Sequence, residues 1–240
     1  MLFEPNRLNY RHAIITGGSS GIGKAIARKL IQEGTNLSLI ARTESKLAAA
    51  KAELIALKAP QNGDACPLNP PNSGDSLPQS WGQGGKSQIL TISADVSDRH
   101  QIEKAIQTAI AHFGAPALLI TAAGMAHPGY FKELPLDIFE ETMAVNYFGS
   151  LYCVKAVLPA MEQQNFGHIA LISSGVGLIG LFGYTPYSAS KFALRGLAES
   201  LRGELKAMGI GLSIAYPPDT DTPQLAAENR FKPPETYIKF

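Results

Sequence analysis

The chain has 240 residues, of which 45% are hydrophobic and 17% charged, and its formal net charge is +1. This length and composition are typical of one large α/β domain with a sizeable core rather than of two domains. The near-neutral charge gives no electrostatic basis for binding nucleic acid, and no apolar run approaches the roughly 20 residues that a membrane span requires.

Strand-like and helix-like patterns alternate along the chain. Short apolar runs that predict strands fall at residues 12–16, 36–41, 88–94, 117–122, 168–173 and 211–216. Patterns that predict helices fall between them, at residues 22–33, 44–58, 98–113, 136–163 and 186–208. Parallel strands need crossover connections, and right-handed crossovers place helices on both faces of the sheet. The alternation therefore predicts an α/β fold, a doubly wound, Rossmann-like parallel sheet in a single domain over residues 1–240.

One segment does not fit this alternation. Residues 60–87 are rich in Pro, Gly, Ser and Asn and have almost no periodic apolar positions. Segments of this composition and length are either functional loops or disordered. We expect a flexible surface insertion between a helix and the third strand, and the alternative is a lid that contains Trp81.

Other features of the sequence concern compartment and metal binding. Cys66 and Cys153 lie in unlike contexts, so they predict no disulfide framework. The histidines show no metal-ligand spacing, so we expect no metal site. The N-terminal segment lacks the apolar run of a signal peptide. These features favour a cytoplasmic protein, with peripheral contact to a membrane left open.

A cluster of glycines follows the first predicted strand directly. Glycine allows a tight turn and lets the backbone approach a pyrophosphate, while the start of the next helix supplies unpaired N–H groups. The spacing is G-x-x-x-G-x-G, which differs from the common G-x-G-x-x-G dinucleotide fingerprint. The candidate cofactor-binding residues in this turn are Gly17, Ser19, Ser20, Gly21, Ile22 and Gly23.

The end of the second predicted strand bears on which dinucleotide binds. Arg42 stands near the place where NAD-binding proteins tend to carry an acidic residue for the ribose hydroxyl. A guanidinium instead suits a ribose 2′-phosphate, through charge-assisted hydrogen bonds. This favours NADP(H) as the cofactor. Asp95, at the end of the third strand, is either an adenine contact or a helix-cap or turn residue.

Tyr187 and Lys191 are four residues apart on a predicted helix, so they share a face. A nearby ammonium favours the phenolate form of tyrosine, which suits Tyr187 to proton transfer. Ser174 follows the fifth strand, at the sheet edge where open α/β folds bind ligands, and can hydrogen-bond a carbonyl oxygen. Taken alone, a Tyr/Lys pair at this spacing is also a common helix-surface pair.

Five motifs together resemble the short-chain dehydrogenase/reductase family. They are TGGSSGIGKAIA, TAAG, AVNYFG, the serine pair at 173–174, and YSASK, and the resemblance extends from residue 12 to about residue 223. It implies a catalytic set in which Tyr187 is the acid–base, Ser174 steadies the substrate oxygen, Lys191 binds ribose and tunes Tyr187, and Asn146 holds a proton-relay water. It also implies cofactor contacts at Asp95, Val96, Ala122, Gly124, Tyr187, Lys191, Pro217 and Thr220. Thr121 departs from the usual Asn of the family, and its hydroxyl can still hydrogen-bond.

A narrower resemblance concerns the substrate. The segments LFGYTPYSASKFALRGLAESL and AYPPDTDTP are similar to those of the 3-ketodihydrosphingosine reductase subfamily. That resemblance implies NADPH-dependent reduction of the 3-keto group of a long-chain sphingoid base, an apolar ketone with a long alkyl chain. Apolar residues after Ser174 either line a groove for that chain or pack the core; they are Val176, Leu178, Ile179, Leu181 and Phe182. The alternatives are a reductase for another apolar ketone, such as a 3-oxoacyl thioester or a steroid, and a non-catalytic dinucleotide-binding protein.

The C-terminal end departs from the family pattern. Members usually continue with a further helix and strand, whereas this chain stops at Phe240. The strand at residues 211–216 would then form an exposed edge, which favours aggregation. We expect a fold that lacks the last helix and strand, with reduced solubility or stability, and the shortened end counts against a homo-oligomer.

Overall fold

The computed structural model of the chain describes residues 11–57 and 87–237. A six-stranded parallel sheet forms its centre, in the order β3-β2-β1-β4-β5-β6. The strands are β1 (His12–Thr16), β2 (Asn36–Ala41), β3 (Ile89–Ser93), β4 (Leu118–Thr121), β5 (Gly167–Ile172) and β6 (Ile210–Ala215). The predicted doubly wound parallel sheet is confirmed, and each strand lies within two residues of its predicted bounds.

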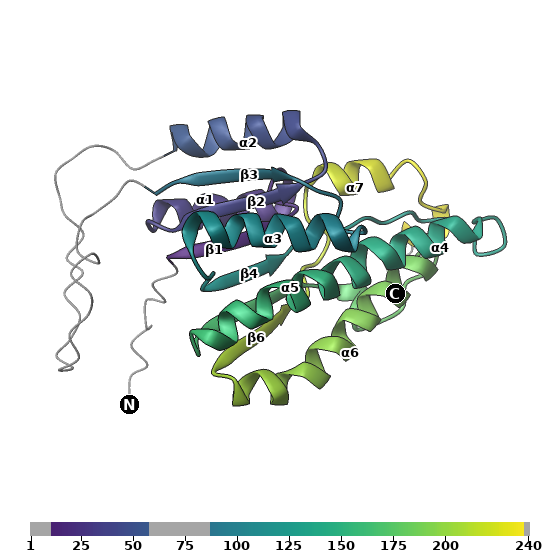
Figure 1. Ribbon diagram of the computed structural model, residues 1–240. Coiled ribbons are helices and arrows are strands. Elements are labelled where there is room, and N and C mark those ends of the chain that lie inside the picture. The colour runs from purple at the N-terminus through teal and green to yellow at the C-terminus, as the bar shows by residue number, and fades with distance from the viewer. Residues whose placement is uncertain (1–10, 58–86, 238–240) are drawn as a thin grey trace, which may run out of the picture.

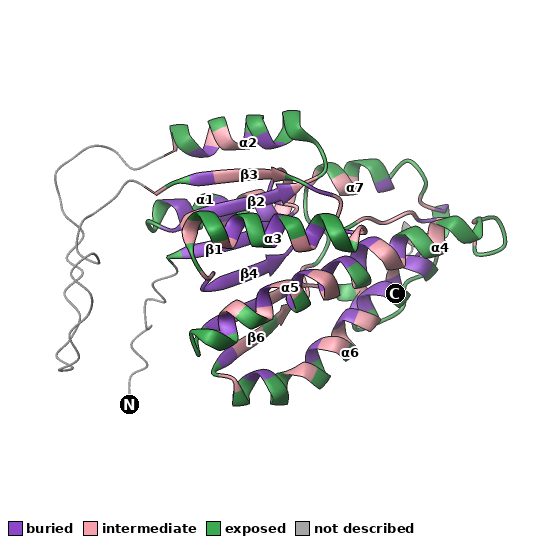
Figure 2. Cartoon of the chain, viewed as in Figure 1, coloured by how far each residue is buried: buried purple, intermediate pink, exposed green. Residues whose placement is uncertain are grey.

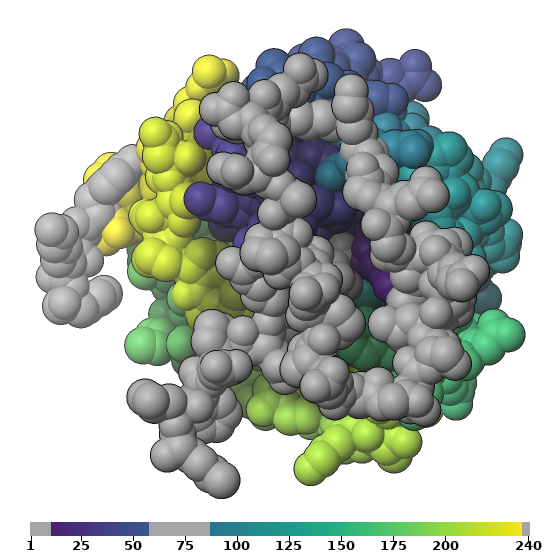
Figure 3. All heavy atoms as spheres, turned by 90° about the vertical axis from the view of Figure 1, so that its left-hand side faces the viewer, coloured from purple at the N-terminus to yellow at the C-terminus, as the bar shows by residue number. Residues whose placement is uncertain are grey.

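Helices cover both faces of this sheet (Figure 1). The helices are α1 (Gly21–Gln32), α2 (Glu44–Ala56), α3 (Arg99–Phe113), α4 (Leu136–Met143), α5 (Gly149–Gln163), α6 (Thr185–Ala207) and α7 (Pro223–Glu228). Buried residues of α3, α5 and α6 form one core with one face of the strands, and those of α1 and α2 form a second core with the other face. Seen from the edge where the strands begin, α2 in blue and the yellow-green end of α6 lie at opposite ends of the molecule (Figure 3).

The apolar strands explain this layering. Successive side chains of a strand point to opposite faces, so Ile14 of β1 joins the core under α3 and α5, while Ala13 and Ile15 join the core under α1 and α2. All five residues of β1 are buried, as expected for a parallel strand that is covered on both faces. Figure 2 shows the same division, with buried strands at the centre and exposed outer sides on the helices.

The long helical region predicted at residues 136–163 contains a break in regularity. A π-helical turn, Ala144–Phe148, separates α4 from α5. Such turns insert one extra residue into a helix and occur frequently at functional sites. Asn146 lies in the middle of this turn, which sets its side chain apart from the regular helical positions before and after it.

The sheet has β3 at one edge and β6 at the other. Within the described residues no strand pairs with the outer side of β6, so the predicted edge strand is confirmed. After β6 the chain turns across the carboxyl ends of the strands and forms α7, which the sequence analysis did not predict. The predicted insertion at residues 60–87 lies almost entirely outside the described residues.

Candidate active site

A pocket of about 290 Å³ lies at the carboxyl ends of the strands, closed on one side by the segment after β6. It brings together most of the residues that the sequence analysis selected. Those that line it are Gly17, Ser19, Ser20, Gly21, Ile22, Arg42, Asp95, Val96, Ala122, Gly124, Ser174, Tyr187, Lys191, Pro217 and Thr220. Two selected residues, Gly23 and Asn146, do not line it.

The glycine turn forms one end of the pocket. Gly17 and Gly21 adopt φ angles of +68° and +50°, which side chains rarely allow. A Cβ on Gly17 would lie 2.7 Å from the backbone nitrogen of Ala123, and a Cβ on Gly23 would lie 2.5 Å from the Gly17 oxygen. Gly17 therefore lets the turn approach the loop that follows β4, whereas Gly23 lets α1 pack against the turn. This cradle, followed directly by the first N–H groups of α1, suits an anionic group.

Cationic side chains gather at the same end. Arg42 follows β2 with its side chain 63% exposed, and its Nη1 lies 3.8 Å from Oδ2 of Asp95. Lys46, in the first turn of α2, also lines the pocket, and the sequence analysis did not select it. Asp95 accepts hydrogen bonds from the backbone nitrogen and the hydroxyl of Ser97 at 2.9 and 2.7 Å. Asp95 thus forms a turn, one of its two predicted roles, and its contact with an adenine stays a prediction.

Lys191 and Tyr187 lie at the other end of the pocket, on α6. Lys191 is only 4% exposed, and its Nζ donates to the carbonyl oxygen of Ile172 at 3.0 Å, where β5 ends. The same Nζ lies 5.5 Å from the centre of the Tyr187 ring. The two side chains therefore share one face of α6, and that face is directed into the pocket rather than toward solvent.

The pKa values of this pair are displaced in opposite directions. Burial lowers the pKa of Lys191 to about 8, while the negative charge of Glu228 acts against that change. Burial also raises the pKa of Tyr187 to about 12, against the lowering effect of its hydrogen bond with Ser174. The nearby ammonium predicted a tyrosine that favours the phenolate, but the loss of hydration on burial has the larger effect on the pKa of Tyr187.

Asn146 lies beneath the pocket rather than in its wall. Its Nδ2 donates to the carbonyl oxygen of Met125 at 2.9 Å and to the Ser190 hydroxyl at 2.8 Å, and its Oδ1 accepts from the Met125 nitrogen at 2.9 Å. The side chain thus joins the loop after β4 to α6 at Ser190, the residue directly before Lys191. Its predicted part in holding a proton-relay water stays a prediction.

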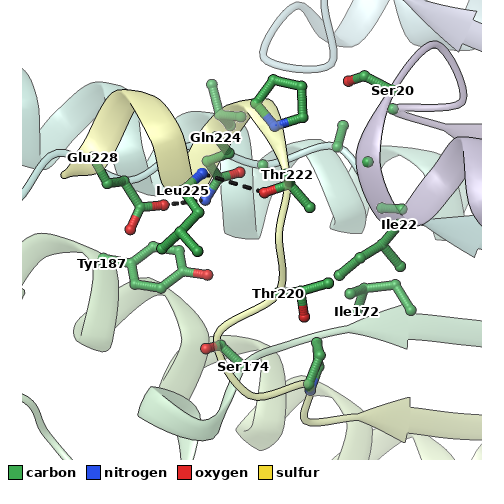
Figure 4. Close-up of a pocket in the computed structure, with 18 of the residues that line it drawn as sticks. Ser20, Ile22, Ile172, Ser174, Tyr187, Thr220, Thr222, Gln224, Leu225 and Glu228 are labelled. Atoms are coloured by element: carbon green, nitrogen blue, oxygen red, sulfur yellow. Dashed lines mark hydrogen bonds between the residues drawn. The ribbon is translucent and has the colours of Figure 1, made fainter.

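A buried polar cluster that the sequence did not lead us to expect surrounds Glu228 of α7. Glu228 is 7% exposed and accepts hydrogen bonds from the hydroxyl of Tyr184 at 2.9 Å and from Nε2 of Gln224 at 2.8 Å. Figure 4 shows Glu228 and Gln224 beside Tyr187 in the pocket. The signal for this helix was Thr222 followed by Pro223, because Thr caps helices and Pro favours their first turn. The Thr222 hydroxyl does accept from the Leu225 nitrogen, at 3.2 Å.

An apolar surface continues from the pocket. Leu181 lines the pocket and also a second cavity of about 350 Å³ whose wall includes Tyr130, Phe131 and Phe182. Four of the five apolar residues named after Ser174 are exposed, and Ile179 reaches 77%; the four are Leu178, Ile179, Leu181 and Phe182. Of the two alternatives, packing in the core does not hold for these four residues, and the fifth, Val176, lines the pocket.

Three further observations concern the described residues. The Thr121 hydroxyl is buried without a hydrogen-bond partner among them. None of their helices is long and apolar enough to cross a bilayer. Across 11–57 and 87–237, no group of three or more His, Cys, Asp or Glu side chains is arranged to hold a metal ion.

The buried ammonium leads to a prediction about stability. In the unfolded chain Lys191 regains its ordinary pKa of 10.5, so between pH 8 and 10.5 the unfolded state binds more protons than the folded state. The free energy of unfolding of the natural protein, measured relative to Lys191→Met, should therefore rise with pH across this window, by on the order of 3 kcal/mol. Urea denaturation of both proteins at the two ends of the window measures this.

The control is Lys155→Met, at an exposed position on α5. It should leave the pH dependence of the natural protein unchanged. A difference between the natural protein and Lys191→Met that stays constant with pH would contradict the account of the buried ammonium.

Several curated proteins align with almost the whole of this chain. The chain is 42% identical over 236 residues to a 3-dehydrosphinganine reductase of Danio rerio, and 41% identical over 236 residues to a 3-ketodihydrosphingosine reductase of Bos taurus. Each match covers 98% of this chain and 64% of the relative, so the chain spans less than two thirds of the length of these curated relatives.

A solved structure and a family model match as well. A variant of actinorhodin polyketide ketoreductase, solved with NADPH, superposes with a TM-score of 0.76 at 27% identity, covering 93% of this chain and 76% of that chain. The family model described as short chain dehydrogenase matches residues 11–68 and 70–233. With the motifs gathered in one pocket of a doubly wound sheet, this match shows that the chain belongs to the short-chain dehydrogenase family.

Proposed function

We propose that the chain binds NADP(H) and reduces the 3-keto group of a long-chain sphingoid base. The observation that carries this proposal is the similarity, at 41% and 42% identity over almost the whole chain, to proteins named as reductases of that ketone. The apolar surface that continues from the pocket supports it, because a long alkyl chain needs such a surface. The ketoreductase solved with NADPH supports the cofactor.

The residues of the pocket fit such a cofactor. The turn at Gly17 and Gly21 and the start of α1 would hold the pyrophosphate, since both supply backbone N–H groups without a side chain in the way. Arg42 and Lys46 would bind the ribose 2′-phosphate. Lys191 would bind the ribose at the nicotinamide end. When bound, NADPH supplies the hydride that reduces the carbonyl carbon.

The chain's own residues then handle the oxygen and the proton. Ser174 would donate a hydrogen bond to the carbonyl oxygen, and Tyr187 would transfer its phenolic proton to that oxygen as the alcohol forms. The ammonium of Lys191 stabilises the phenolate that remains. Asn146 would keep α6 and the loop after β4 in register beneath this group, through the hydrogen bonds described above.

The substrate chain would lie along the apolar surface. Leu181 belongs to the walls of both the pocket and the neighbouring cavity, so a ketone in the pocket can extend its alkyl chain past this residue toward Phe182 and Tyr130. Burial of methylene groups against these side chains would contribute about 0.8 kcal/mol each. A reductase for a 3-oxoacyl thioester or a steroid would use the same apolar surface, and the choice between these substrates is made by assay.

The direct test is NADPH oxidation with a panel of ketones: 3-ketosphinganine, a 3-oxoacyl thioester and a steroid ketone. We expect the highest kcat/KM for 3-ketosphinganine.

Tyr187→Phe should lower turnover by roughly 10²- to 10⁴-fold, the contribution typical of a general acid, while NADPH binding, followed by its fluorescence, stays nearly intact. Tyr152→Phe, on α5 and outside the pocket, is the matched control. Turnover near that of the natural protein in Tyr187→Phe would refute the mechanism, and no reduction of 3-ketosphinganine alongside reduction of another ketone would refute the substrate.

A second prediction concerns cofactor choice. Arg42→Asp replaces a charge-assisted contact to phosphate with a repulsion, next to the existing carboxylate of Asp95. We expect affinity for NADPH to fall roughly 10- to 100-fold, the equivalent of about 1.5–3 kcal/mol for a charged hydrogen bond, with little change for NADH. Arg99→Asp, at an exposed position on α3, is the control. Equal affinity of the natural protein for NADPH and NADH would contradict the assignment.

A further inference from the structure

A carboxylate is buried in the wall of the pocket close to Tyr187. Glu228 lines the pocket and is only 7% exposed. Both of its hydrogen bonds come from neutral donors, the hydroxyl of Tyr184 and the amide of Gln224. Among the residues that the structure describes, none forms an ion pair with it. A carboxylate has about four acceptor positions, so Glu228 retains capacity for another donor.

The position of this charge is unusual for a site that must generate a phenolate. Burial of a carboxylate without a paired cation is costly. The charge of Glu228 also raises the pKa of Tyr187, in addition to the larger effect of burial, and so opposes loss of its proton. It helps to keep Lys191 charged. A positive charge on the substrate would form an ion pair with Glu228. It would thereby reduce the effect by which the Glu228 charge raises the pKa of Tyr187.

We propose that Glu228 binds a protonated amino group on the carbon next to the reacting carbonyl. Tyr187 and Glu228 line the same pocket (Figure 4), so a ketone whose oxygen meets the Tyr187 hydroxyl can direct one of the two carbons beside the carbonyl toward Glu228. This inference rests on the proposed function, because a sphingoid ketone carries an amino group at that carbon. Tyr184 and Gln224 act as positioning residues that hold the carboxylate in place.

The same arrangement would select between ketones. A neutral thioester or steroid ketone would fill the pocket and leave Glu228 buried without an ion-pair partner among the described residues. A site built to pair with a polar group discriminates strongly against ligands that lack that group. The preference for an amino ketone would therefore come from Glu228, and the preference for a long chain from the apolar surface beyond Leu181.

The experiment compares short-chain 3-ketosphinganine with the same ketone in which hydrogen replaces the amino group. Glu228→Gln keeps the size of the side chain and removes its charge. We expect kcat/KM for the amino ketone to fall roughly 10- to 100-fold, as for loss of a charged hydrogen bond, and kcat/KM for the neutral ketone to stay level or rise. Tyr184→Phe removes one donor but keeps the carboxylate, so it should retain the preference for the amino ketone. Glu199→Gln, exposed on α6, should leave both substrates unaffected.

A binding measurement on the natural protein does not depend on any variant folding. By calorimetry, the amino alcohol product should bind at least about 10-fold more tightly than its counterpart without the amino group, for the same reason. Equal affinities, or an equal loss for both ketones in a folded Glu228→Gln, would overturn the role of Glu228 while leaving the proposed function standing. If 3-ketosphinganine is not reduced but the amino alcohol still binds more tightly than the neutral one, the amine site stands and the proposed function fails.

Discussion

Lys191 carries an ammonium group into the interior of the protein, and the arrangement of the pocket depends on how that charge is accommodated. Its acceptor is the carbonyl oxygen of Ile172, which is available because β5 ends there. The helix that carries Lys191 must therefore begin close to the carboxyl end of β5. This requirement fixes α6 against the sheet edge and brings Tyr187, one turn earlier, into the wall of the pocket.

The sheet topology places the cofactor end of the pocket beside this charge. Parallel strands bring their carboxyl ends to one edge, so the glycine turn after β1, Arg42 after β2 and Ser174 after β5 meet there although they are far apart in the sequence. The segment after β6 then crosses the same edge and adds α7. A Cβ on Gly21 would lie 3.2 Å from a methyl group of Thr222, which shows how closely this segment approaches the glycine turn.

The regular parts of the molecule could be predicted because periodicity and glycine placement are local signals. The apolar runs predicted the strands, and the glycine cluster predicted the turn before α1. The YSASK spacing placed Tyr187 and Lys191 on one face of a helix. The raised pKa of Tyr187 could not be predicted in this way, because it depends on burial in the folded protein and, to a smaller extent, on the charge of Glu228 on α7.

Other features depend on tertiary contacts that a pattern does not contain. At the π-helical turn, the Asn146 side chain forms hydrogen bonds with both Met125 and Ser190. The residues AVNYFG contain no pattern that predicts such a turn. Ile179 and Phe182 are of residue types common in cores, but both are exposed, and Phe182 lines the second cavity. Glu228 is of a residue type that is almost never fully buried unless paired, so its burial became apparent only with its partners.

We infer that burial and the charge of Glu228 together keep the proton on Tyr187 until a ligand enters the pocket. The most direct test is the ionisation of Tyr187, followed by NMR of labelled tyrosine in the protein without ligand, with Tyr187→Phe to assign the signal. At pH of about 10, where an ordinary tyrosine is half ionised, Tyr187 should remain protonated, consistent with a pKa raised to about 12. Glu228→Gln should move its ionisation to lower pH. A Tyr187 that ionises at the ordinary pH, with no change in Glu228→Gln, would contradict the account.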